Sequence, residues 1–168
     1  MRESAFLQLF DVHHAALFRF AYRLTNSISD AEDIVQECFL SLLRPGSSYD
    51  SRRTPIRTYL YGAVRNQWLK RRRDSPTAGT APDPIDDRSP ESDLLTGEVQ
   101  DAVAQAIGTL PETQREVLIL AHYEQLPLAE IARILEIELG AVKSRLERAR
   151  ARLRETLSAY APPERSTR

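Results

Sequence analysis

Cationic side chains recur through one C-terminal segment at spacings that suit the binding of nucleic acid. They are Lys143, Arg145, Arg148, Arg150, Arg152 and Arg154. Apolar residues repeat among them at helical spacing, and these are Val142, Leu146, Ala149, Leu153 and Leu157. A helix with this pattern buries one side and offers the cations on its other side to phosphates and base edges. A merely solvated arginine-rich helix face is the alternative interpretation.

A second apolar stripe directly precedes this helix, which predicts a helix-turn-helix over residues 128–157. Its members are Leu128, Ile131, Ala132 and Leu135. Glu136 stands at the corner, where a glycine is usual, and a left-handed conformation costs a non-glycine residue about 1 kcal/mol. We expect Gly140 to relieve part of the bend.

The composition is that of an ordinary soluble protein and gives little support to an enzyme. Of 168 residues, 42% are hydrophobic and 28% are charged. No apolar run approaches the about 20 residues of a membrane-spanning helix, and the N-terminus lacks signal-peptide features, so we expect a cytoplasmic protein. Cys38 falls on an apolar stripe and is predicted to be core. The histidines are not spaced with acids or Cys38 as a metal site, so neither a metal nor a cofactor is expected.

Charge is segregated along the chain, although the net charge is only -1. Residues 67–73, QWLKRRR, are cationic, whereas residues 74–93 are acidic and rich in proline and serine. This stretch is predicted to be a flexible linker between helical domains at residues 1–73 and 94–160, with a frayed tail at 161–168.

Helical periodicity outside the linker predicts an all-α fold of two small helical domains. In the first domain a long helix ends near residues 25–27, a second begins with a capping box of Ser29 and Glu32, and a third has Pro55 at its first position. In the second domain a helix ends at Gly108, and Pro111 opens the next. We find no β-hairpin signal and no glycine-rich phosphate loop.

Sequence motifs in both predicted domains together resemble one family. They are DAEDIVQECFLSL at 30–42, IRTYLYGAVRNQWLKRRR at 56–73, LPETQREVLIL at 110–120 and EIARILEIELGAVKSRLERARARLR at 130–154. In this order, with a linker between the halves, the chain resembles the extracytoplasmic-function sigma factors of the sigma-70 family. The resemblance implies a non-enzymatic protein that joins core RNA polymerase, recognises promoter DNA and helps to open it.

The resemblance also implies a role for particular residues. By the resemblance, Asp33, Gln36 and Glu37 would bind core polymerase at its clamp helices. Their spacing at i, i+3 and i+4 places them on one acidic helix face. The minus-ten contacts would be Arg65, Asn66, Trp68, Lys70 and Arg71, with the loop 46–54 helping to hold a flipped base. Trp68 could equally be core. The minus-thirty-five contacts would be Lys143, Ser144, Arg145, Glu147 and Arg148.

Several alternatives stay open at this point. The linker carboxylates either follow a basic channel of the polymerase or belong to a solvated tether. An anti-sigma protein is a further candidate partner. The rival function is a helix-turn-helix repressor or activator, which would form a stable dimer on duplex DNA without polymerase.

Overall fold

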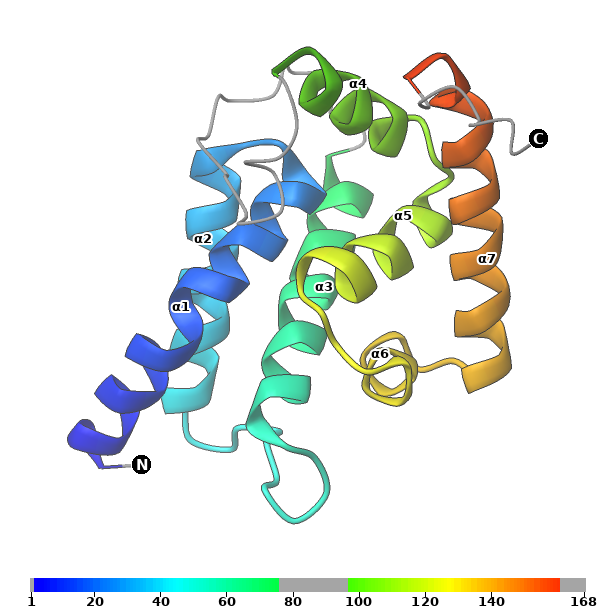
Figure 1. The fold of residues 1–168 in the computed structure, drawn as a ribbon. Coiled ribbons are helices and arrows are strands. Elements are labelled where there is room, and N and C mark those ends of the chain that lie inside the picture. Colours follow the sequence, from blue (N-terminus) through cyan, green and yellow to red (C-terminus); the bar gives the residue numbers. More distant parts are fainter. Residues whose placement is uncertain (1, 76–96, 161–168) are drawn as a thin grey trace.

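The structure, a computed structural model, describes residues 2–75 and 97–160, and every regular element within these ranges is helical (Figure 1). The elements run in the order α1 (Glu3–Thr25), α2 (Ile28–Leu43), α3 (Ile56–Asp74), α4 (Gly97–Gly108), α5 (Glu112–Leu118), the π-helical turn η2 (Ile119–Tyr123), α6 (Leu128–Leu135), α7 (Leu139–Thr156) and the short turn η3 (Ser158–Tyr160). The all-α prediction is confirmed.

Helices α1, α2 and α3 form the N-terminal bundle, and aromatic rings fill much of its interior. Phe39 of α2 packs against Phe6 and Phe10 of α1, with ring centroids 6.1 and 5.0 Å apart. Phe20 of α1 meets Tyr61 of α3 edge to face at 5.2 Å. Edge contacts of this kind add to the gain from burying apolar area, so they help to hold α2 and α3 against α1.

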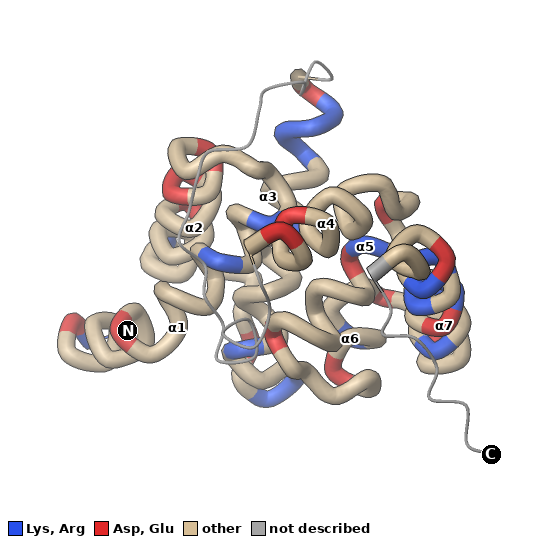
Figure 2. The backbone as a smooth tube through the Cα atoms, turned by 45° about the horizontal axis from the view of Figure 1, so that its top comes forward, with Lys and Arg blue, Asp and Glu red and all other residues tan. Residues whose placement is uncertain are grey.

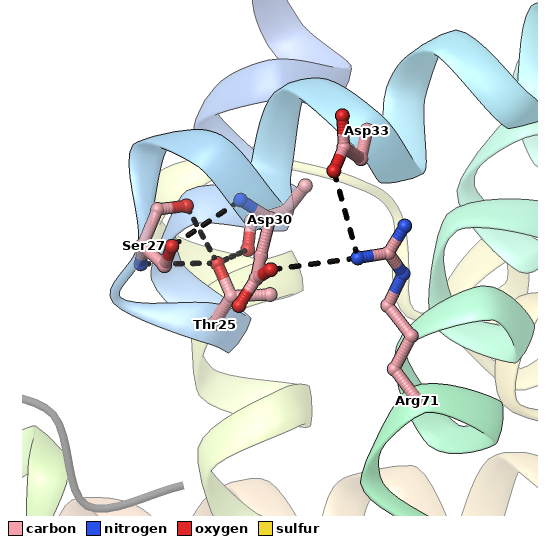
Figure 3. Close-up of polar contacts among 6 residues, drawn as sticks. Thr25, Ser27, Asp30, Asp33 and Arg71 are labelled. Atoms are coloured by element: carbon pink, nitrogen blue, oxygen red, sulfur yellow. Dashed lines mark hydrogen bonds and ion pairs between the residues drawn. The ribbon is translucent and has the colours of Figure 1, made fainter. Parts of the chain in front are cut away.

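The turn between α1 and α2 corrects the predicted capping box. Asn26 ends α1 in the left-handed conformation, and Ser27 follows with an extended backbone. The Ser27 hydroxyl accepts a hydrogen bond from the Asp30 backbone N–H at 3.2 Å (Figure 3). Ser27, and not Ser29, is therefore the N-cap, because the cap residue needs non-helical dihedrals and Ser29 already lies inside the helix.

Other predicted boundaries differ by a residue. Pro55 and Pro111 each lie at the N-cap, one position before the first helical residue. Helix α3 continues through Asp74, which was assigned to the linker. Ser75 follows as its C-cap, whereas residues 76–93 of the predicted linker and the predicted tail at 161–168 lie outside the described residues.

The helix-turn-helix is formed by α6 and α7. Glu136 adopts the left-handed conformation at the corner, with φ 55° and ψ 44°, as its position indicated. The Ile137 N–H donates to the Ala132 carbonyl at 3.0 Å, which satisfies one of the last carbonyls of α6. Gly140 lies within α7 and is not among the described residues with positive φ, so the expectation that it relieves the bend was wrong.

The N-terminal bundle and the C-terminal helices share one hydrophobic core in this structure. Helix α3 lies against α6, and α1 contacts η2. A Cβ added to Gly62 of α3 would lie 4.0 Å from the Ile134 carbonyl oxygen of α6. Each part therefore covers apolar surface that the other would expose alone. No helix in the described ranges meets the length and hydropathy of a membrane span.

Candidate nucleic-acid interface

Helix α7 presents its predicted DNA contacts along its N-terminal half. Val142, Leu146 and Ala149 are buried, and α7 packs mainly against α5 and α6. The predicted contacts lie between these buried positions: Lys143, Ser144, Glu147 and Arg148 are exposed, and Arg145 is half-buried. The structure therefore leaves the solvent side of α7 available to a groove of duplex DNA.

Arg150 of the same helix is held by a neighbouring element. Its Nε donates to Nε2 of His122 in η2 at 3.3 Å. No helical periodicity relates these two residues, because they lie 28 positions apart. The contact orients one cation at the middle of α7, beyond the predicted base contacts.

Helix α3 carries a dense set of cations, and its last turns appear almost wholly as Lys and Arg in Figure 2. Asn66 and Lys70 are exposed at i, i+4, so they share one solvent-facing side. Arg71 turns toward the beginning of α2, where its Nη1 lies 3.4 Å from Asp30 Oδ1 and 4.0 Å from Asp33 Oδ2 (Figure 3).

Trp68 lies in the core with 3% of its surface exposed, and the guanidinium of Arg72 covers its ring at 5.1 Å from the centroid. With α3 packed in this way, Trp68 cannot contact the minus-ten DNA strand as predicted. Its burial agrees with the alternative that Trp68 belongs to the core. The physical reason is that Trp68 continues the buried stripe of Leu60, Tyr61 and Val64 along α3. Its ring is not available for stacking on a base.

The acidic face of α2 lies beside the basic end of α3. Asp33 and Gln36 are exposed, while Glu37 is half-buried and pairs with Arg44 at 2.9 Å. One shallow groove between the two helices is lined by Asp33, Gln36, Glu37, Leu40, Gln67, Lys70 and Arg71. The structure thus brings the predicted polymerase contacts and part of the predicted minus-ten contacts onto one surface.

Arg65, the remaining predicted minus-ten contact, points to the C-terminal helices. Its Nε lies 3.0 Å from Oε1 of Glu116 on α5, and the Glu116 side chain is only 2% exposed. Burial raises the pKa of Glu116 above its ordinary value, against the opposing attraction of Arg65. Glu116 was not among the residues predicted from the sequence, although its spacing of four residues from the apolar Leu120 indicates that it faces inward.

Metal or thiol chemistry finds no support in the described ranges. No group of three or more His, Cys, Asp and Glu side chains there is arranged to hold a metal ion. Cys38 is buried, as predicted, and burial raises the pKa of its thiol to about 12. A thiol in that environment is a poor nucleophile at neutral pH.

Both halves of the chain match known families. Residues 9–76 match Sigma-70 region 2, and residues 100–153 match Sigma-70, region 4. The chain is 31% identical over 169 residues to the ECF RNA polymerase sigma factor SigW of Bacillus subtilis, covering 92% of this chain and 90% of that protein. It is 36% identical over 157 residues to the ECF RNA polymerase sigma factor SigM of Mycobacterium tuberculosis, covering 91% of this chain and 77% of that protein.

Solved structures agree with these matches. A co-crystal structure of the sigma factor RpoE with the anti-sigma factor NepR from Bartonella quintana matches with a TM-score of 0.70 and 26% identity, over 94% of this chain and 99% of that chain. The structure of CnrH with the cytosolic domain of CnrY matches with a TM-score of 0.71 and 26% identity, over 95% and 92%. The chain therefore belongs to the extracytoplasmic-function sigma factors of the sigma-70 family, which recognise promoters and initiate transcription with RNA polymerase.

Proposed function

We propose that this chain uses its separate surfaces for the successive steps of initiation. Asp33, Gln36 and Glu37 on α2 bind core polymerase, and the N-terminal half of α7 reads the minus-thirty-five element as duplex. The minus-ten element is read on α3 once its strand is exposed. The observation that carries the proposal is the outward side of α7, where predicted contacts are exposed between buried Val142, Leu146 and Ala149.

We assign the minus-thirty-five contacts to Lys143, Ser144, Arg145, Glu147 and Arg148. Polar side chains of mixed charge suit base edges, which present both hydrogen-bond donors and acceptors in the major groove. The exposed arginines nearer the C-terminal end, such as Arg154, suit phosphates, which specify no sequence.

The minus-ten contacts are divided between α3 and the loop that precedes it. Asn66 and Lys70 are exposed and reach a strand directly, and Arg71 lies beside them at the groove with α2. The loop 46–54 joins α2 to the beginning of α3, where Tyr49 and Tyr59 pack with centroids 5.0 Å apart. Asn66 lies ten residues beyond Ile56, about 15 Å along the helix, so we propose that it and the loop contact different nucleotides.

The functional units that follow are a region 2-like domain at 1–73, a linker at 74–93 and a region 4-like domain at 94–160. The protein works with polymerase in the cytoplasm, and its role needs no catalytic group and no cofactor. One matched structure is a complex of a sigma factor with the anti-sigma factor NepR, and another is a complex of CnrH with the cytosolic domain of CnrY. These matches support an anti-sigma protein as a further partner of this chain.

A pull-down with core RNA polymerase, followed by run-off transcription from a genomic library, tests this function. We expect the chain to bind core and to produce transcripts that are absent with core alone. Failure to bind core would overturn the proposal. A stable dimer on duplex DNA without polymerase would point instead to an ordinary helix-turn-helix regulator.

A further inference from the structure

One side of α3 carries three arginines and two aromatic residues, and all but the buried Trp68 pair with glutamates of the C-terminal part. Arg57, Tyr61, Arg65, Trp68 and Arg72 follow one another at steps of three or four residues, which places them on one helix face. We call this set the α3 stripe. It is a different face from the one that carries Asn66 and Lys70.

Glutamates of the C-terminal helices meet this stripe along its length. Arg57 Nε donates to Glu130 Oε1 of α6 at 2.9 Å. Arg72 at the other end forms an ion pair with Glu112 of α5.

The middle of the stripe is paired in the same way. Arg65 pairs with Glu116 at 3.0 Å, and the Tyr61 hydroxyl donates to Glu124 Oε2 at 2.7 Å. Glu112, Glu116 and Glu130 lie on α5 and α6, and Glu124 directly follows η2, so all four belong to the C-terminal part and the pairing forms a row across the interface between the two parts.

These pairs set how the N-terminal bundle and the C-terminal helices are aligned, but they contribute little to the free energy that holds the two parts together. Arg57 and Arg72 keep 49% and 44% of their side-chain surface exposed, and ion pairs at such positions contribute little free energy. The buried pair of Arg65 and Glu116 also contributes little to the free energy of the interface, because the cost of desolvating the Glu116 carboxylate, which raises its pKa, opposes its attraction to Arg65. Anions of similar spacing can therefore compete with the glutamates for the arginines.

The backbone of a nucleic acid is such a row of anions. Fifteen residues separate Arg57 from Arg72, or about 22 Å of helix, which is the length of several nucleotides. Arg65, in the middle of the stripe, is one of the residues that the family resemblance implies as a minus-ten contact. We infer that Glu112, Glu116, Glu124 and Glu130 occupy, in the free chain, the face of α3 that binds DNA phosphates during promoter opening.

The free chain is thus closed upon its own DNA-binding face, and Arg57 and Arg72 are additional phosphate contacts. This inference rests on the proposed function, because it concerns another face of α3, the helix on which the minus-ten element is proposed to be read. It predicts weak binding of single-stranded DNA by the free protein, since only the open fraction of the molecules can bind.

The test compares two full-length variants with the same change in charge. Glu112→Lys with Glu130→Lys places like charges opposite Arg72 and Arg57. Asp101→Lys with Glu155→Lys changes two exposed acids of the C-terminal helices away from the stripe and is the matched control.

The distance between the two parts is followed by energy transfer between dyes on Glu32→Cys and Ala151→Cys, both exposed positions. The buried thiol of Cys38, with its pKa of about 12, does not compete for label. Binding is followed by the fluorescence anisotropy of a labelled single-stranded oligonucleotide of mixed sequence at about 50 mM salt, where phosphate contacts are strong.

We expect the stripe variant to lose energy transfer and to bind the oligonucleotide about tenfold more tightly than the control variant. Adding Arg57→Glu and Arg72→Glu to the stripe variant reverses the charges on both sides, so it should restore energy transfer and abolish the gain in binding.

A charge-free variant gives an independent check. In Gly62→Leu, a bulky side chain would meet α6, since the added Cβ alone lies 4.0 Å from the Ile134 carbonyl oxygen. It should also lower energy transfer and raise affinity for the oligonucleotide.

Unchanged energy transfer in the stripe variant and in Gly62→Leu would overturn the closed state. Lost energy transfer without a gain in binding over the control would overturn the masking of a DNA face. Run-off transcription with wild-type protein separates these failures from a failure of the proposed function, because it does not depend on how the free chain is arranged.

Discussion

Arg65 of α3 and Glu116 of α5 form an ion pair across the interface between the N-terminal bundle and the C-terminal helices, with Nε and Oε1 3.0 Å apart. The glutamate side chain is 2% exposed and the arginine 20%. The pair therefore places a carboxylate in the core of the closed chain. Burial dominates the shift of the Glu116 pKa, which lies above its ordinary value of 4.5.

This pair predicts a pH-dependent difference between wild type and Glu116→Gln. Because the pKa of Glu116 is raised in the folded chain, the folded chain binds its proton more tightly than the unfolded chain does. The contribution of Glu116 to stability is therefore full below pH 4.5 and falls as the pH rises through the raised pKa. Glutamine does not titrate. The melting temperature of Glu116→Gln minus that of wild type should therefore increase from pH 4.5 toward neutrality.

Differential scanning calorimetry across this pH range measures the difference. Glu155→Gln, at the exposed end of α7, controls for the change in net charge. A flat difference would mean that Arg65 cancels the effect of burial on the Glu116 pKa, and a difference that falls with rising pH would mean that Arg65 dominates; either result would contradict the prediction.

The acidic face of α2 is tested by Asp33→Arg combined with Gln36→Ala. Both side chains are exposed, and the contact of Asp33 with Arg71 is long at 4.0 Å, so loss of stability should stay within about 1 kcal/mol. Holoenzyme assembly should be abolished in a core pull-down. Glu32→Arg, exposed on the same helix but outside the groove with α3, should assemble normally. Retained core binding by the double variant would remove this face from the interface.

Arg148 and Arg154 of α7 should differ in what they contribute to DNA binding. Arg148→Ala should relax sequence preference at one upstream position, at a cost of about 1–3 kcal/mol for the preferred base. Arg154→Ala should weaken binding to all sequences alike and lower the salt dependence, because a phosphate contact carries no sequence information. Selection of duplexes by holoenzyme at several salt concentrations measures both effects. Identical sequence profiles for the two variants would contradict this division.

Asn66→Ala should impair promoter opening more than assembly. An amide that reads an extruded base acts only after the strand is exposed, so core binding should be unchanged while the open complex forms poorly. Permanganate footprinting reports unpaired thymines directly, and the core pull-down is the internal control. A normal bubble with an unaltered preference at the downstream element would refute the role.

Glu136→Gly should stabilise the helix-turn-helix. Glu136 has φ 55°, a conformation that costs a residue with a Cβ about 1 kcal/mol and costs glycine almost nothing. We expect a gain of about 1 kcal/mol in the free energy of unfolding, measured by urea denaturation. Arg133→Gly, exposed within α6, should lose about the same amount because its backbone is helical. Equal losses in both variants would show that Glu136 is not strained.

The amino-acid sequence by itself determined the helices and most of their ends. Apolar spacing located the helical segments, and Asn26, Glu136 and Pro111 mark ends that the structure confirms to within a residue. Such features are local, because a helix hydrogen bond or cap joins residues only a few positions apart. The acidic side of α2 and the cationic side of α7 were also readable, since they follow from helical periodicity.

Only the tertiary structure decided how the cations of α3 are used. Arg65 and Glu116 are 51 residues apart, and Arg57 and Glu130 are 73 apart, so no periodicity relates them. Trp68 and Arg65 both read as candidate strand contacts, yet packing of α3 buries one and pairs the other across the interface. The physical reason is that helical spacing defines which side chains share a face, whereas the neighbour that covers the face depends on contacts between segments distant along the chain.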